Sequence, residues 1–135
     1  MDDQYGTPPE GAAPASGGLR ASPIGEVVED RGVVSVSLAG SFCGDSVTKA
    51  LREVVHDLGA RGISRIVLDL KEIQRIDSAG LGAIASAYVS VTRASGKFVL
   101  ASATGRVRDL LSTAMLLQVI PLYPDVRSAR AALEP

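Results

Sequence analysis

The sequence has 135 residues, of which 46% are hydrophobic and 4% aromatic, which suits one domain with an aliphatic core and is too short for two full domains. Fourteen Lys and Arg against fifteen Asp and Glu give a formal charge of −1, so no strong positive field favours direct nucleic-acid binding. Cys43 is the only cysteine, and neither a signal peptide nor a membrane-spanning apolar run is evident, which predicts a cytoplasmic protein without membrane insertion.

The chain is expected to begin with a disordered tail over residues 1–22, because runs such as TPPEGAAPASGG follow neither hydrophobic period. A folded domain is expected over residues 23–135. Its first element is a predicted β-hairpin, in which GEVV and VVSVSL flank the turn-like EDRG. Residues 45–60 then carry apolar side chains at helical spacing, with Asp45 or Ser46 available as the N-cap.

The rest of the chain alternates between strand and helix patterns. The apolar run RIVLDL predicts a strand ending at Leu70, and helical spacing follows over 81–91. KFVLAS, a helix over 107–114, a strand within LLQVIPLY bounded by Pro121 and Pro124, and a final helix complete the pattern. Alternation implies parallel pairing, to which the hairpin adds an antiparallel pair. We therefore expect an α/β fold with a mixed, mostly parallel sheet of four to five strands against about four helices.

The stretch IDSAGLGAI, which leads into the second helix, carries the most chemical information. Asp77 or Ser78 could cap that helix, because either side-chain oxygen can accept from backbone N–H groups two or three residues on. The Ser78 hydroxyl is then expected near the surface at a helix N-terminus, where a phosphate would be tolerated. A partner packed over Gly80 and Gly82 would meet that added bulk and charge beside Asp77, which weakens binding.

The two glycines of this stretch allow two explanations. Each costs about 1 kcal/mol relative to Ala inside a helix, so something must approach the backbone at Gly80 and Gly82 closely. The approaching body is either a partner protein or the sheet under the helix, and spacing alone does not decide between them.

IDSAGLGAI resembles the D-S-x-G-L-G signature of STAS-domain anti-sigma factor antagonists, and the similarity extends from the hairpin to the helix RVRDLLSTAMLLQV. The resemblance implies a STAS-like fold and partner switching. In this family the unmodified antagonist binds an anti-sigma factor of the serine-kinase type and so frees a sigma factor, whereas phosphorylation releases the antagonist. Ser78 is then the phosphorylation site, ATP and Mg²⁺ reside on the kinase, and a phosphatase restores the unmodified form.

The resemblance also implies which residues bind the partner. Asp77 is the acidic neighbour of the phosphorylated residue, and Ala79 replaces a second Ser present in many relatives, so Ser78 carries the only hydroxyl of the motif. Relatives commonly have an acidic residue two or three positions beyond the Gly that ends the first long strand, where this chain has Phe42 and Cys43. The expected partner-binding residues are Asp77, Ala79, Gly80, Leu81 and Gly82, with Ser41 and Asp45 from the preceding loop.

Other chemistry is poorly supported. No catalytic residues are expected, because the single histidine, His56, is offset from the apolar stripe of its helix, and one Cys with one His falls short of a zinc pattern. No cofactor of the chain's own is expected either. The alternative function that stays open is a STAS-type structural subunit docked on the ATPase of a lipid-transport ABC complex, which needs no phosphate cycle.

Overall fold

The computed structural model describes residues 23–135 and contains one five-stranded sheet with the order β1-β2-β3-β4-β5. β1 and β2 pair antiparallel, whereas β2–β3, β3–β4 and β4–β5 are parallel. The predicted hairpin and the mixed, mostly parallel sheet are thus confirmed, while the predicted tail over 1–22 lies outside the described residues. The strands are β1 Ile24–Asp30, β2 Val33–Phe42, β3 Arg65–Ile76, β4 Lys97–Ala101 and β5 Leu122–Tyr123.

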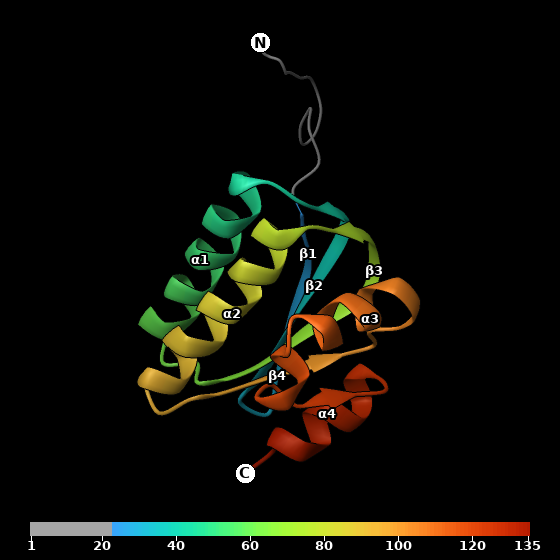
Figure 1. The fold of residues 1–135 in the computed structure, drawn as a ribbon. Coiled ribbons are helices and arrows are strands. Elements are labelled where there is room, and N and C mark those ends of the chain that lie inside the picture. The colour runs from blue at the N-terminus through green and yellow to red at the C-terminus, as the bar shows by residue number, and fades with distance from the viewer. Residues whose placement is uncertain (1–22) are drawn as a thin grey trace, which may run out of the picture.

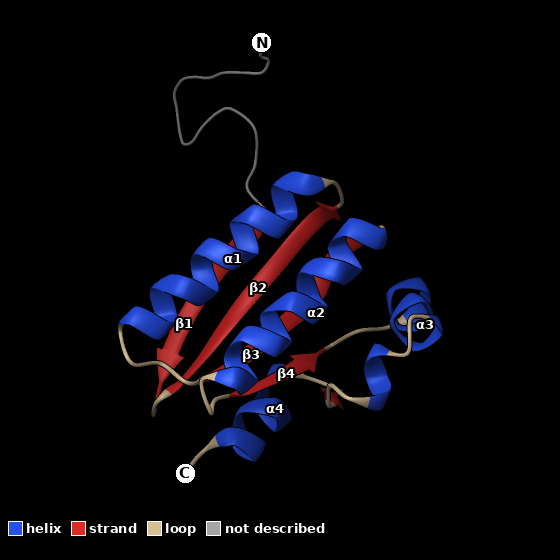
Figure 2. Ribbon diagram, turned by 60° about the vertical axis from the view of Figure 1, so that its left-hand side comes forward, coloured by secondary structure: helices blue, strands red, loops and turns tan. Residues whose placement is uncertain are grey.

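Four α-helices cover the sheet (Figure 1): α1 Asp45–Ala60, α2 Ser78–Arg93, α3 Gly105–Thr113 and α4 Val126–Leu133. The first two lie side by side across one face and begin at the same end of the molecule (Figure 2). This arrangement follows from the parallel pairing of β2 and β3, because the two strands end at the same edge of the sheet and each is followed directly by its helix.

The apolar side chains form two cores, one on each face of the sheet. The larger core joins the sheet to α1, α2 and α3, and the smaller core lies under α4 and includes Val33, Val67, Val99, Ala129 and Leu133. Since successive strand residues point to opposite faces, Val33 serves the smaller core and Val34 the larger one. Because helices cover both faces of the sheet, the central strands are nearly continuous apolar runs in the sequence.

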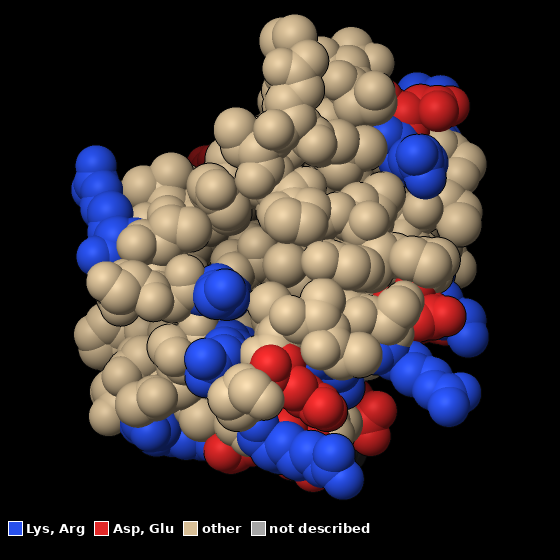
Figure 3. All heavy atoms as spheres, turned by 90° about the horizontal axis from the view of Figure 1, so that it is seen from below, with Lys and Arg blue, Asp and Glu red and all other residues tan. Residues whose placement is uncertain are grey.

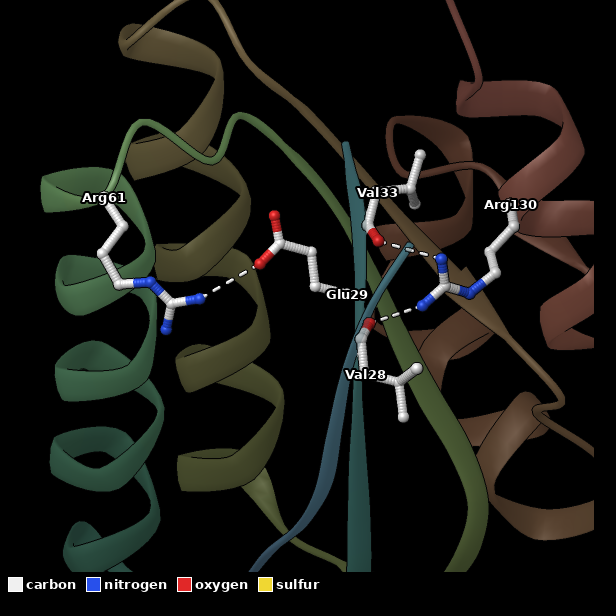
Figure 4. Close-up of polar contacts among 5 residues, drawn as sticks. All are labelled: Val28, Glu29, Val33, Arg61 and Arg130. Atoms are coloured by element: carbon white, nitrogen blue, oxygen red, sulfur yellow. Dashed lines mark hydrogen bonds and ion pairs between the residues drawn. The ribbon is translucent and has the colours of Figure 1, made fainter. Parts of the chain in front are cut away.

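The half-buried side chain of Arg130 connects α4 to the hairpin. Arg130 Nη1 donates to the Val33 carbonyl at 2.9 Å, and Nη2 donates to the Val28 carbonyl (Figure 4). Nη2 also donates to Ser35 Oγ at 3.0 Å. These acceptors lie on β1 and β2, so one guanidinium joins the last helix to the first two strands. The Arg61–Glu29 ion pair, at 3.3 Å, joins the hairpin to the end of α1 on the other side.

Two boundaries differ from the sequence-based expectation. β3 does not end at Leu70 but continues to Ile76, because its second half pairs with residues 39–42 of β2. Helix α1 begins at Asp45 as expected, yet its N-cap is Gly44, with φ of 84° and no side-chain cap, rather than Asp45 or Ser46.

The segment LLQVIPLY is mostly not a strand. Met115 adopts a left-handed conformation, with φ of 65°, and residues Leu116–Gln118 form a 3₁₀ turn called η1. Pro121 and Pro124 bound the strand as expected, but only Leu122–Tyr123 pair with β4. In a short apolar run, the sequence pattern does not distinguish a strand from a helical turn. Here the left-handed backbone at Met115 turns the chain after α3, and the 3₁₀ turn η1 follows directly.

The charged side chains are distributed without a large field of one sign. On the face seen in Figure 3, a broad uncharged area occupies the upper centre, and the Asp and Glu side chains lie next to Lys and Arg side chains at the bottom and on the right. The formal charge of the chain is −1. Within residues 23–135, no helix is both long enough and apolar enough to cross a membrane.

Candidate functional site

The candidate site lies where β2 and β3 end and α1 and α2 begin. Phe42 pairs with Ile76 at the last position of the two strands, so both chains leave the sheet together. Only Cys43 and Gly44 connect β2 to α1, and only Asp77 connects β3 to α2. The two connections therefore meet at the carboxyl edge of the sheet, where parallel sheets commonly place binding residues.

Asp77 is the residue that joins these connections. Its Oδ1 accepts a hydrogen bond from the Gly80 amide at 2.9 Å, which makes it the N-cap of α2, and its Oδ2 accepts from the Gly44 amide at 3.1 Å. The Gly80 hydrogen bond is the main cause that lowers the pKa of Asp77 below its ordinary value, desolvation opposes it, and the Gly44 hydrogen bond adds to it. The carboxylate is thus charged at neutral pH with both oxygens already engaged.

Ser78 is the first residue of α2 and is exposed. Since Asp77 takes the capping role, the Ser78 hydroxyl is left without a hydrogen bond to any of the described residues. Its position in the first helical turn places it in the favourable field of the helix dipole for a negative group. Added charge at this hydroxyl would change the outer surface without displacing any contact that holds the fold together.

The two signature glycines have different environments. A Cβ on Gly80 would lie 2.2 Å from the Phe42 carbonyl oxygen and 2.8 Å from Ile76 Cγ1, so packing of α2 against the strand ends requires glycine there. A Cβ on Gly82 would meet nothing within 4 Å, and Gly82 is exposed. Packing on the sheet therefore explains Gly80, whereas nothing within the described chain requires glycine at position 82.

The other predicted site residues lie at the same end of the molecule. Ala79 and Leu81 are half-buried in the first turn of α2, and Asp45 is exposed at the first position of α1. Ser41 is exposed on β2 beside Arg75 of β3, so it belongs to the strand rather than to a loop. Sequence reasoning placed these residues near one another through the family resemblance, and the structure brings them to one edge.

One contributor was missed by the sequence analysis. Gly44 supplies the amide that binds Asp77, and its left-handed backbone turns the chain from β2 into α1. A glycine directly before a helix that begins with Asp is the available signal, but it predicts a turn and not a hydrogen bond to a residue so distant in sequence.

The histidine and the metal-ligand inventory add no chemistry to this site. His56 is exposed and lies eleven residues into α1, which is about 16 Å along the helix axis from its first residue. Among residues 23–135 there is no group of three or more His, Cys, Asp and Glu side chains that could hold a metal ion.

Comparisons with known proteins identify relatives over most of the chain. Residues 26–129 match the model of the STAS domain. The anti-sigma F factor antagonist of Paenibacillus polymyxa is 28% identical over 109 residues, which are 81% of this chain and 93% of that protein. An anti-sigma factor antagonist from Mycobacterium paratuberculosis superimposes with a TM-score of 0.70 at 29% identity, over 87% of this chain and all of that one.

A more distant structure has the same fold. SpoIIAA, a Bacillus cell fate determinant and anti-sigma factor antagonist, has been solved in phosphorylated and unphosphorylated forms. The phosphorylated form gives a TM-score of 0.62 at 14% identity, over 79% of this chain and 97% of that one. At this identity the likeness concerns the fold alone.

Proposed function

The chain belongs to the STAS domain family, and we propose that it is an anti-sigma factor antagonist controlled by phosphorylation of Ser78. The unmodified protein binds an anti-sigma factor of the serine-kinase type, and a sigma factor is released from that partner. The protein itself is a regulatory binding module, and the kinase supplies ATP and Mg²⁺.

The observation that carries this proposal is the free, exposed hydroxyl of Ser78 beside a fully engaged Asp77. A kinase needs a serine whose hydroxyl is accessible and not committed to the fold, and Ser78 meets both conditions. Relatives that are anti-sigma factor antagonists support the general role.

The geometry also accounts for release. A phosphoserine carries about −1.5 to −2 charges, and at position 78 it would stand next to the charged carboxylate of Asp77 and above the exposed backbone at Gly82. The helix dipole tolerates this charge in the free protein. A partner packed on the same surface has to desolvate or repel it, which weakens the complex.

The proposal is tested with purified protein and the serine-kinase anti-sigma factors of the same organism. We expect one kinase to bind the wild type and Ser78→Ala, to bind Ser78→Asp at least tenfold more weakly, and to phosphorylate the wild type at Ser78 alone. Ser90→Asp is the matched control, because Ser90 is an exposed serine of the same helix twelve residues further on. Binding of Ser78→Asp equal to that of Ser90→Asp, or ATP incubation that leaves Ser78 unmodified, would refute the proposal.

A further inference from the structure

A small cleft lies beside the signature segment, which we define as residues 77–82. It has a volume of about 150 Å³ and separates the end of β3 from the start of α3. Three residues on each side form its walls: Gln74, Arg75 and Ile76 from β3, and Arg106, Val107 and Leu110 from α3. Arginines from two different elements thus line the cleft together with three apolar residues, immediately before Asp77 in the chain.

A β-bulge gives Arg75 its position. Gly40 pairs with Ile73 and Ser41 pairs with Arg75, so Gln74 is an extra residue in β3. In an unbroken strand Arg75 would point to the same face as buried Ile73. With the bulge, Arg75 is exposed and Ile76 is buried instead. Bulges commonly re-aim side chains in this way at functional edges.

Contacts within the chain do not explain either arginine. Among the described residues, Arg75 and Arg106 form no ion pair and no hydrogen bond through their side chains, and both are exposed. Asp109 lies three residues beyond Arg106 on α3 but is not paired with it. Arg106 also stands in the first turn of a helix that has no acidic residue there, where the helix dipole opposes a positive charge.

We propose that this cleft receives an acidic segment of the protein partner, with an Asp or Glu carboxylate held between Arg75 and Arg106. The inference rests on the proposed function and adds the chemistry of the partner's contact. Guanidinium groups bind carboxylates through two parallel hydrogen bonds, and the apolar residues Ile76, Val107 and Leu110, which also line the cleft, can contact an apolar neighbour of that carboxylate. Since Arg75 precedes Ser78 by three residues, the same contact would hold a kinase over the serine.

The test measures the affinity of the full chain for the kinase identified through Ser78→Asp. We expect Arg75→Glu and Arg106→Glu each to weaken binding at least tenfold, which is about 1.4 kcal/mol. Added salt should weaken the wild-type complex more than that of the double variant. Arg108→Glu is the matched control, because Arg108 is exposed on α3 but does not line the cleft. Thermal unfolding of each variant shows that the fold is kept.

A second measurement does not need the kinase. Titration of the wild type with a hexaglutamate peptide should shift the NMR signals of Arg75 and Arg106, whereas hexalysine should not. If Ser78→Asp abolishes kinase binding while both cleft variants bind like Arg108→Glu, the cleft inference is wrong and the proposed function stands. If no kinase distinguishes Ser78→Asp from the wild type, the proposed function fails. If, in addition, hexaglutamate shifts only the NMR signals of residues other than Arg75 and Arg106, the cleft inference fails as well.

Discussion

The carboxylate of Asp77 accepts a hydrogen bond from the amide of Gly44, 33 residues earlier in the chain, at 3.1 Å. Its second oxygen accepts from Gly80 at 2.9 Å. One side chain thereby fixes the start of α2 relative to the connection between β2 and α1. Because backbone amides satisfy both oxygens, neither oxygen needs the Ser78 hydroxyl, and that hydroxyl remains available for modification.

Replacement of Asp77 should therefore destabilise the fold. We expect Asp77→Ala to lower the thermal midpoint by about 3 to 6 °C, because the N-cap and the link to Gly44 are both lost. Asp77→Asn keeps one carbonyl acceptor and should lose less. Circular dichroism checks this order, with Asp109→Ala as the control, since Asp109 is exposed and unpaired among the described residues. Equal midpoints for Asp77→Ala and Asp109→Ala would contradict the prediction.

The stability should depend on pH in the acid range. The pKa of Asp77 is lowered from its ordinary value of 3.8, mainly by the Gly80 amide. The pKa of Asp125 is lowered from 3.8, mainly by the side-chain hydrogen bond from Ser128. A carboxyl with a lower pKa in the folded state contributes stability that is fully present above 3.8 and is lost as the pH falls through the folded value.

Urea unfolding across the acid range measures this loss. The wild-type midpoint should fall as the pH drops below about 4, and the Asp77→Asn/Asp125→Asn double variant should fall less over the same range. Above that range, the double variant should be the less stable of the two proteins. Parallel acid profiles for both proteins would show that other carboxyl groups cause the loss.

The sequence predicted the order of the elements but not the course of β3. Alternating apolar patterns determine which residues face the cores, so the five strands and four helices were predictable. The bulge at Gln74 was not, because it arises from pairing with β2 and leaves buried Ile73 and Ile76 three residues apart, which is not the period of a strand. The sequence pattern therefore predicts a strand that ends at Leu70, although β3 continues to Ile76.

The site was predictable to a similar degree. Capping preference alone left Asp77 and Ser78 as equal candidates, because both types of side chain cap helices. The structure decides for Asp77, whose Oδ1 accepts from the Gly80 amide, and whose Oδ2 also accepts from the Gly44 amide that only the folded chain brings near. Likewise, Arg75 and Arg106 line the same cleft only because α3 packs against the extended end of β3.

The two signature glycines should respond in opposite ways to Ala. Gly80→Ala places a Cβ against the Phe42 carbonyl and should cost about 2 kcal/mol or more, as overpacking does. Gly82→Ala enters open space and should stabilise the helix by up to about 1 kcal/mol. Urea unfolding tests both variants. If a partner approaches the backbone at Gly82, the more stable Gly82→Ala variant should also bind the kinase more weakly, whereas unchanged binding would exclude that approach.

Arg130 should contribute more to stability than Arg61, the other arginine that contacts the hairpin from outside it. Its guanidinium donates to the carbonyls of Val28 and Val33, and Arg130→Ala should cost about 2 kcal/mol because those bonds are charge-assisted and fix α4 to the sheet. Arg61→Ala is the matched control, since it removes only the exposed ion pair to Glu29 at 3.3 Å and should cost less than about 1 kcal/mol. Arg130→Lys should recover part of the loss, because an ammonium group reaches fewer acceptors than the planar fork. Equal unfolding free energies for Arg130→Ala and Arg61→Ala would show that the contacts of α4 depend on its apolar side chains alone.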